Sequence, residues 1–303
     1  MWQLFSLGAI FCNTLEETID KAAMLGSSTL DTFVAALIRN IIVLGVAIVV
    51  AFLIYRSVPE IIFSLPIIWW GLVYAIQAIS YTWILKYIEI TAASVTFALL
   101  PLVFLPIDIF FRQESLTLMQ IGGVGVLVIG GLIFFARKDL SKRLSNSKYI
   151  LMMLGVLIFD AIVIGSEGYI FKSYYEQYEL SPASFLVSGM LYMCAFLAVM
   201  LAIHFAWAGK GIQLQGALSY ARGASLAKLA DYGNIFFTLH ALTLATVTQV
   251  AAMKVIHPLI LLMITMFAQQ KFKVDLEEVF TKETVIQKSA GILLVVIGSF
   301  LIA

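Results

Sequence analysis

Charged residues are scarce in this chain. They make up 12% of its 303 positions, whereas hydrophobic residues make up 62% and the mean hydropathy is +1.00. Soluble domains contain roughly 25% charged residues. A water-soluble fold of this composition would lack polar side chains to cover its surface, while a lipid bilayer accepts apolar side chains on the outside. The scarcity of charge therefore excludes an ordinary soluble domain and predicts an integral membrane protein.

Cysteine and histidine are scarce as well, and basic residues show no surplus. Cys12 and Cys194 both lie in apolar stretches and lack the paired spacing of a disulfide framework or a metal site. The sequence has no His-Glu-x-x-His motif, and no nucleophile with a partner base stands out. The net charge of +1 offers no basic surface for nucleic acid. We therefore expect no enzyme active site, no metal, no cofactor and no nucleic-acid partner.

Long apolar runs are the main feature that the sequence does contain. A helix needs about 20 mostly apolar residues to cross a bilayer, and about ten such runs follow one another. The predicted spans cover residues 2–24, 30–54, 61–85, 90–111, 117–136, 149–171, 182–207, 223–244, 247–269 and 284–303. The expected fold class is an all-α polytopic membrane protein of about ten transmembrane helices. Because most connections are short, neighbouring helices would run antiparallel.

The two halves of the chain resemble each other at corresponding helices. The matching positions are Pro101 and Pro258, Glu16 and Glu167, Lys21 and Lys172, Gly123 and Gly291, and Gly130 and Gly298. Internal similarity of this kind indicates a repeat. We expect a five-helix repeat over residues 1–138, a basic linker over 139–148 and a second five-helix repeat over 149–303. Because five is odd, the second repeat would be inverted in the membrane, as is typical of secondary transporters.

The same segments resemble a known family. The run Thr-Ala-Ala-Ser-Val at 91–95, Pro101, Glu114, the glycine-rich stretch 122–131 and Arg39 are similar to the EamA-type branch of the drug/metabolite transporter superfamily. The resemblance covers essentially the whole chain in helix count and repeat structure. It implies transport of a small solute by two inverted repeats, and its motifs of small residues and proline indicate a fold better than a substrate.

The chain departs from the family pattern at two places. Residues 269–271, Gln-Gln-Lys, stand in the second repeat where the first has the acidic Glu114. Asn13 stands where the superfamily's small multidrug members have the glutamate that couples export to protons. An asparagine cannot carry a proton, so that role would fall to Glu16 or Glu17.

Polar residues inside the spans are the candidates for a substrate site. An ionisable residue costs roughly 2.5–3.5 kcal/mol on insertion scales, so such residues normally face the protein interior. Spacings of three, four and seven residues place side chains on one helix face. Three spans contain such stripes: Asn13, Glu16, Glu17 and Asp20; Asp160 and Glu167; and Asp231, Asn234 and Thr238. The stripes predict an acidic cavity between the two repeats. Two alternatives are a solvated helix end and a structural ion pair of Arg39 with an acid such as Asp20.

The third span predicts an aromatic wall for this cavity. Trp70, Tyr74, Gln77 and Tyr81 fall on one helix face. Aromatic faces bind cations through cation–π contact. The alternative is simple packing together with an interfacial aromatic belt.

The predicted fourth and ninth spans complete the substrate site. Gln249, Met253 and His257 share one face of the ninth span, and Ser94 lies in the 91–95 motif. Pro258 is expected to kink a helix over 247–269. His257 is either a group that titrates near neutral pH or a hydrogen-bonded structural residue.

These features lead us to expect a secondary transporter that works by alternating access on a small nitrogenous solute, such as an amino acid, an amine or a quaternary ammonium compound. Its partners would be that solute, the lipid bilayer and a coupling proton or ion. The chain would act as a monomer or a homodimer in the bacterial cytoplasmic membrane. The alternatives are an exporter of other metabolites or sugars, with the acids as coupling groups, and a non-transporting membrane sensor or assembly protein.

Two arguments about orientation disagree. The family resemblance implies that both termini lie in the cytoplasm. Most lysine and arginine residues, however, lie in the loops after odd-numbered spans, above all in residues 137–148. The positive-inside rule places those loops in the cytoplasm and the termini outside.

Overall fold

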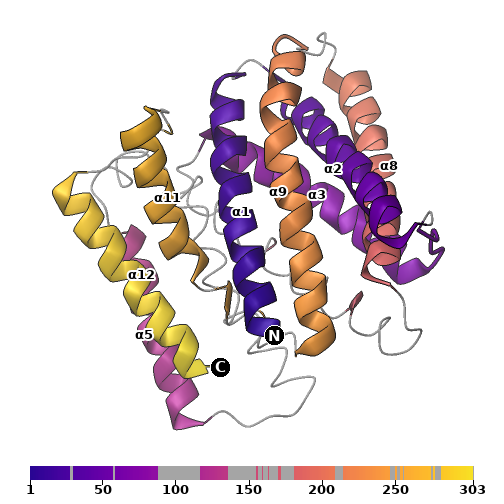
Figure 1. Ribbon diagram of the computed structural model, residues 1–303. Coiled ribbons are helices and arrows are strands. Elements are labelled where there is room, and N and C mark those ends of the chain that lie inside the picture. Colours follow the sequence, from indigo (N-terminus) through magenta and orange to yellow (C-terminus); the bar gives the residue numbers. More distant parts are fainter. Residues whose placement is uncertain are drawn as a thin grey trace. The chain divides into compact units, whose positions relative to one another are not determined.

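The computed structural model describes residues 1–27, 30–56, 59–87, 117–135, 181–208, 214–245, 256–273 and 281–302, and a few isolated residues between them. The helices are α1 (Trp2–Leu25), α2 (Thr32–Tyr55), α3 (Leu65–Tyr87), α5 (Leu118–Phe135), α8 (Pro182–Ala208), α9 (Ala217–Leu244), α11 (His257–Phe272) and α12 (Lys282–Ile302) (Figure 1). These ranges contain no strand. The all-α class is therefore confirmed for the described part of the chain.

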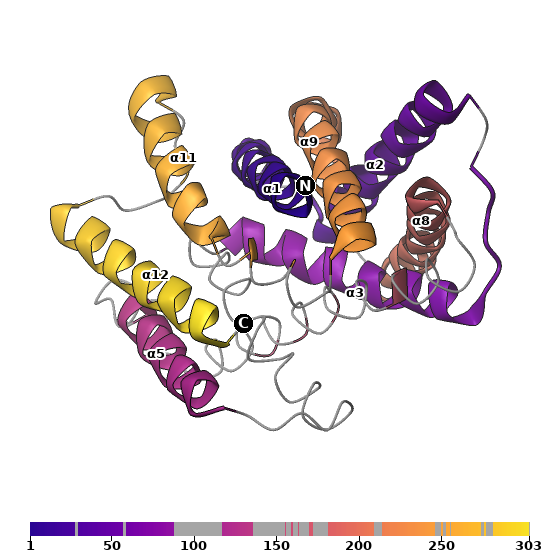
Figure 2. The ribbon, with the colours of Figure 1, turned by 60° about the horizontal axis from the view of Figure 1, so that its bottom comes forward.

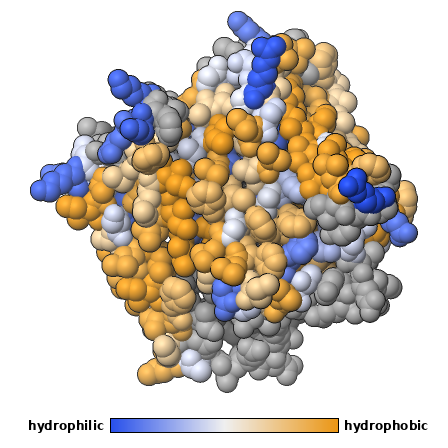
Figure 3. Space-filling view, viewed as in Figure 1, coloured by the Kyte–Doolittle hydropathy of each residue, from blue (hydrophilic) through white to orange (hydrophobic). Residues whose placement is uncertain are grey.

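Three of these helices are long and apolar enough to cross a membrane. The segments are Thr32–Leu53 of α2, Leu65–Trp83 of α3 and Pro182–Trp207 of α8. Large apolar side chains are exposed along them, including Phe52, which is 51% exposed, and Trp207, which is 87% exposed. Figure 3 shows apolar residues over much of one face of the molecule. Surfaces of this kind suit contact with lipid rather than water, and they support the prediction of a helical membrane protein.

Each described helix overlaps one of the predicted spans. The predicted spans 90–111 and 149–171 lie wholly or mostly outside the described residues. The largest difference concerns Pro258, which lies in the first turn of α11 and not inside a helix over 247–269. Ile256 N donates to Met253 O (3.2 Å) in a turn just before α11. Proline is favourable in a first turn because its missing N–H would have no intrahelical partner there.

The chain divides into two compact units that do not follow its two halves. One unit comprises Met1–Ile88 and Ser166–Leu244, and the other comprises Glu89–Gly165 and Ala245–Ala303. The first unit thus contains α1, α2, α3, α8 and α9, and the second contains α5, α11 and α12. Each unit combines helices from both predicted repeats. The predicted linker 139–148 lies outside the described residues.

In the first unit, α1 and α9 pack side by side over most of their length (Figures 1 and 2). Small residues line the contact: a Cβ atom on Gly223 would lie 3.0 Å from Ala23 Cβ, and one on Gly233 would lie 3.0 Å from Cys12 Sγ. Small residues let helix backbones approach closely inside membranes. The approach also brings the polar faces of the two helices into contact.

The helix α3 packs against α8 where the ring of Trp70 lies against Gly189. The Trp70 ring stands over Gly189, where a Cβ atom would overlap it. Trp70 is 2% exposed, and its ring lies 5.2 Å from the ring of Phe185 and 5.0 Å from that of Tyr74, centroid to centroid. Its side chain is therefore part of the packed core of this unit.

The start of α2 is held by an N-cap. Asp31 Oδ1 accepts hydrogen bonds from Phe33 N (2.8 Å) and Val34 N (3.4 Å), which satisfies two of the N–H groups that a helix start leaves without intrahelical partners. Asp31 Oδ2 lies 3.3 Å from His204 Nε2 of α8. The His204 ring stacks on Phe33, with 4.4 Å between centroids. One carboxylate thus caps α2 and links it to α8.

In the second unit, glycines bring α5 and α12 into backbone contact. A Cβ atom on Gly130 would lie 2.9 Å from Gly291 O, and one on Gly298 would lie 2.8 Å from Gly123 O. Glycines at these positions allow the close helix packing that is typical of membrane interiors.

Candidate functional site

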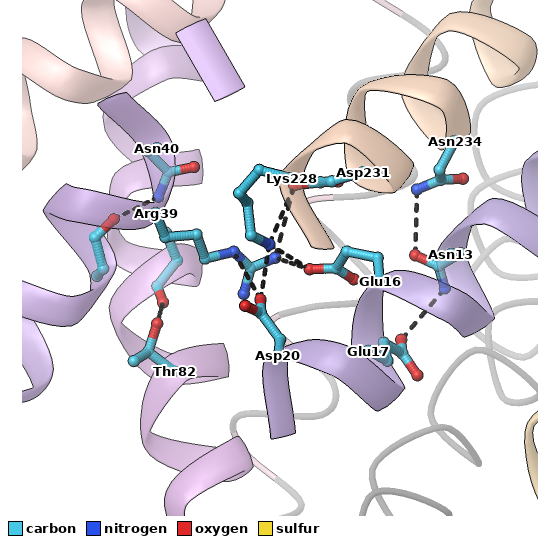
Figure 4. A network of polar contacts seen from close by, with 12 residues as sticks. Asn13, Glu16, Glu17, Asp20, Arg39, Asn40, Thr82, Lys228, Asp231 and Asn234 are labelled. Carbon is cyan, nitrogen blue, oxygen red and sulfur yellow. Dashed lines mark hydrogen bonds and ion pairs between the residues drawn. The ribbon is translucent and has the colours of Figure 1, made fainter. Parts of the chain in front are cut away.

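The candidate site is a cluster of five ionisable side chains inside the first unit. Glu16 and Asp20 lie one turn apart on α1, Arg39 projects from α2, and Lys228 and Asp231 lie one turn apart on α9 (Figure 4). Spacings of three and four residues on a helix bring side chains to one face. The cluster therefore forms where the polar faces of α1 and α9 meet beside α2. We call these five residues the ion cluster.

Lys228 lies at the centre of the ion cluster. Its Nζ atom is 2.5 Å from Glu16 Oε1, 2.6 Å from Asp20 Oδ2 and 3.5 Å from Asp231 Oδ2. The side chain of Lys228 is fully buried, as is that of Asp20. Lysine and aspartate are almost never fully buried unless they are paired. Here the three carboxylates supply the pairing.

Arg39 contacts the same three acids from the side of α2. Its Nη2 atom lies 2.8 Å from Glu16 Oε1 and 3.8 Å from Asp231 Oδ2. Its Nε atom lies 3.5 Å from Asp20 Oδ2. The guanidinium group also lies over the Tyr81 ring, with Cζ 4.5 Å from the centroid. This is a cation–π contact, which adds to the ion pairs in a dry environment.

The formal charges of the ion cluster do not balance. Three carboxylates and two cations leave a net charge of −1 among these five residues. Their side chains are at most 12% exposed. Burying ions costs several kcal/mol each unless partners and hydrogen bonds compensate. One surplus negative charge in this setting favours the approach of a cation.

A further polar network continues along the same seam. Asn234 Nδ2 donates to Asn13 Oδ1 (3.1 Å), and Asn13 Nδ2 donates to Glu17 Oε1 (3.1 Å). Thr238 Oγ1 donates to Asn234 Oδ1 (3.4 Å). The network and the ion cluster together make the α1–α9 interface polar over several turns, as Figure 4 shows for most of these residues.

A further buried lysine has a different partner. Lys21 of α1 is 0% exposed, and its Nζ donates to the carbonyl oxygen of Leu85 near the end of α3 (2.8 Å). Helix C-terminal carbonyls are favourable partners for a cation. Although Lys21 is adjacent to Asp20 in sequence, its ammonium group donates to the backbone of α3.

The structure brings together only part of the predicted substrate site. Asn13, Glu16, Glu17 and Asn234 lie in one interface, and Arg39 is 3.5 Å from Asp20 as predicted for an ion pair. On α3, Trp70 is buried in the core, while Tyr74 and Gln77 are partly buried.

The other predicted site residues lie outside the described residues or in the second compact unit. Ser94, Asp160, Glu167 and Gln249 lie outside the described residues. Met253 and His257 belong to the second compact unit. A substrate site that combines residues of the two units therefore stays a prediction.

Lys228 was not among the predicted site residues. Arg39 was the cation expected to neutralise one of the acids in the polar stripes. Lys228 stands three residues before Asp231 and six before Asn234 in α9, so it shares their stripe. This spacing could have identified Lys228 as part of the site from the sequence.

Among the residues that the structure describes, no group of three or more His, Cys, Asp or Glu side chains is arranged to hold a metal ion.

Comparisons with known proteins reveal a similar fold. No protein-family model matches the chain, and no curated protein matches it. A solved structure described only as "Crystal structure of protein" is similar, with a TM-score of 0.60 and 15% sequence identity. The similarity covers 99% of this chain and 95% of the other. At this identity it shows a shared fold alone.

Proposed function

We propose that this protein is a secondary transporter that moves a small nitrogenous metabolite across a membrane by alternating access. The substrate would be an amino acid, an amine or a quaternary ammonium compound, with a proton or an ion for coupling. The proposal includes ten transmembrane helices in two inverted repeats, similar to EamA-type transporters, in the bacterial cytoplasmic membrane. It also includes a monomer or a homodimer as the working form.

The observation that supports this proposal most is the ion cluster. Ionisable residues inside membrane helices are costly, face the interior and commonly mark a substrate or ion pathway. The five residues of the cluster come from α1, α2 and α9 and are nearly dry. Their net charge of −1 suits a positively charged solute. The whole-chain similarity in fold to a solved structure adds no information on substrate.

One observation favours a second candidate function. Glu16 Oε1 already contacts both Arg39 and Lys228, so the acid proposed to meet the substrate has protein partners. Acids that are paired with cations of the protein are what a structural network in a non-transporting membrane sensor or assembly protein would contain. Export of other metabolites or sugars, with the acids as coupling groups, is the alternative within transport.

Solute counterflow in liposomes tests the proposal. Vesicles containing the purified protein are loaded with an unlabelled solute and diluted into the same solute in labelled form. A carrier that alternates between two sides accumulates label transiently, and protein-free vesicles do not. We expect counterflow with at least one amino acid or amine. Absence of counterflow with amino acids, amines, quaternary ammonium compounds and sugars would favour the non-transporting role.

A further inference from the structure

The position of Lys228 Nζ is that of a bound primary ammonium. Two carboxylate oxygens, Glu16 Oε1 and Asp20 Oδ2, lie at 2.5 and 2.6 Å, and Asp231 Oδ2 lies at 3.5 Å. An ammonium group has three N–H donors, and three carboxylates surround it here. Hydrogen bonds between an ammonium and a carboxylate are charge-assisted and stronger than those between neutral groups. The arrangement is a receptor for –NH3⁺ that the protein fills with its own side chain.

The chemistry of this position discriminates among cations. A quaternary ammonium has no N–H donor, and its alkyl groups keep its nitrogen from approaching a carboxylate oxygen as closely as Lys228 Nζ does. A guanidinium is planar, and the guanidinium of Arg39 already contacts Glu16 and Asp20 from α2. The close carboxylate contacts of this position therefore favour a primary amine among nitrogenous solutes.

A second observation indicates that the cluster lacks a partner. Five buried polar atoms of Asp20, Arg39 and Tyr81 have no hydrogen-bond partner among the described residues: Asp20 Oδ1 and Oδ2, Arg39 Nε and Nη1, and the Tyr81 hydroxyl. Tyr81 is 6% exposed and lies against the Arg39 guanidinium. Buried polar atoms in folded proteins are nearly always paired, and each exception calls for a partner. These atoms offer both acceptors and donors for hydrogen bonds to a further partner.

We propose that Lys228 is a tethered competitor of the substrate, which is a primary ammonium compound that takes the place of Lys228 Nζ between Glu16 and Asp20. This inference rests on the proposed transport function and narrows its substrate class. Occupation by Lys228 keeps the two carboxylates neutralised when no substrate is bound. Binding of the substrate's ammonium releases the lysine, and with it a contact that joins α9 to α1.

The proposal predicts that removal of Lys228 tightens binding. A tethered group competes at an effective concentration that reaches the order of millimolar or more. If the ligand binds only to molecules in which Lys228 has left the site, its apparent Kd equals the intrinsic Kd divided by the fraction of such molecules. If Lys228 has only a structural role, its removal has the opposite effect, because it disorders the acids and weakens the binding of any ligand.

The experiment measures binding of n-propylammonium to purified protein by ligand-induced thermal stabilisation. Lys228→Met is compared with the wild type and with Lys21→Met, which removes another fully buried lysine that donates to the Leu85 carbonyl. We expect the apparent Kd of n-propylammonium to fall about tenfold or more in Lys228→Met and to stay at the wild-type value in Lys21→Met. Tetramethylammonium should stabilise neither variant.

Two results would overturn the inference. One is an apparent Kd in Lys228→Met that is no lower than in the wild type. The other is equal stabilisation by tetramethylammonium or sodium, which would mean that the site responds to charge alone. If Lys228→Met does not fold by itself, recovery of folded protein with n-propylammonium but not with tetramethylammonium is the supporting result, and Lys228→Gln provides the Kd. Counterflow by the wild-type protein tests the proposed transport function separately. The transport function and the role of Lys228 as a competitor can therefore fail independently.

Discussion

Lys228 of α9 and Glu16 of α1 are 212 positions apart in the sequence, and their charged atoms are 2.5 Å apart. The pair joins the first helix to a helix from the second half of the chain inside one compact unit. Asp20, Asp231 and Arg39 complete the ion cluster around it. The net charge of these five residues determines how substitutions in the ion cluster affect the stability of the protein.

The first prediction concerns an asymmetry between the cations and the acids of the cluster. Lys228→Met raises the surplus negative charge to −2 in a dry site, and breaking a buried pair in this way costs about 3–5 kcal/mol. Asp231→Asn removes the surplus charge, and it breaks only the longer contacts of 3.5 and 3.8 Å. We expect a much lower melting temperature for Lys228→Met and a nearly unchanged one for Asp231→Asn. Equal losses in the two variants would show that charge balance does not govern the cluster.

The second prediction concerns the glycine contact between α5 and α12. In Gly130→Ala the new methyl group would meet Val295 N at 2.7 Å and Gly291 O at 2.9 Å. These are backbone atoms, so the helices must separate, at a cost of about 1–3 kcal/mol. Gly125→Ala is the matched control, since nothing lies within 4 Å of its added Cβ. Thermal unfolding should separate the two variants, and a normal melting temperature for Gly130→Ala would argue against the contact.

The third prediction tests how Trp70 acts. Gly189→Ala should destabilise the protein because the added Cβ overlaps the Trp70 ring. If Trp70 is a packing residue, the second substitution Trp70→Leu should restore part of the lost stability, because a smaller side chain makes room. Non-additivity of this kind is expected between residues in contact. Additive losses in the double variant would place the two side chains in separate environments.

The fourth prediction concerns the N-cap of α2. Asp31→Ala removes the side-chain acceptor of the Phe33 and Val34 amides and should cost about 1 kcal/mol. Asp31→Asn keeps an oxygen at the cap, so it should retain most of that stability while weakening the contact with His204. A melting temperature of Asp31→Asn as low as that of Asp31→Ala would mean that the charge facing His204, and not the cap, stabilises this end of α2.

Much of the helical architecture could be predicted from hydrophobicity, because the bilayer imposes both apolar composition and a minimum length on a spanning helix. The acidic stripe of α1 could be predicted from helical periodicity alone. So could an ion pair for Arg39, because an isolated guanidinium inside a helix bundle requires a partner.

The remaining features depend on contacts between distant segments. Lys228 was missed because a lysine in a helix can also extend to the membrane surface, and only the approach of α1 explains its burial. Trp70 was predicted to line a cavity because periodicity places it on a face but does not tell which neighbour fills that face. The neighbour is Gly189, more than a hundred residues away. The division into two interleaved units is likewise a property of packing and not of sequence order.

The central claim is that the buried ion cluster serves transport, and counterflow by Glu16→Gln tests it most directly. The variant leaves two carboxylates and two cations in the cluster, and its amide oxygen keeps an acceptor for Lys228 and Arg39, so the protein should still fold. Glu283→Gln, which changes an exposed acid on α12, is the control. We predict that the counterflow observed with the wild type is retained in Glu283→Gln and lost in Glu16→Gln at equal incorporation. Undiminished counterflow in Glu16→Gln would contradict a role of the cluster in transport.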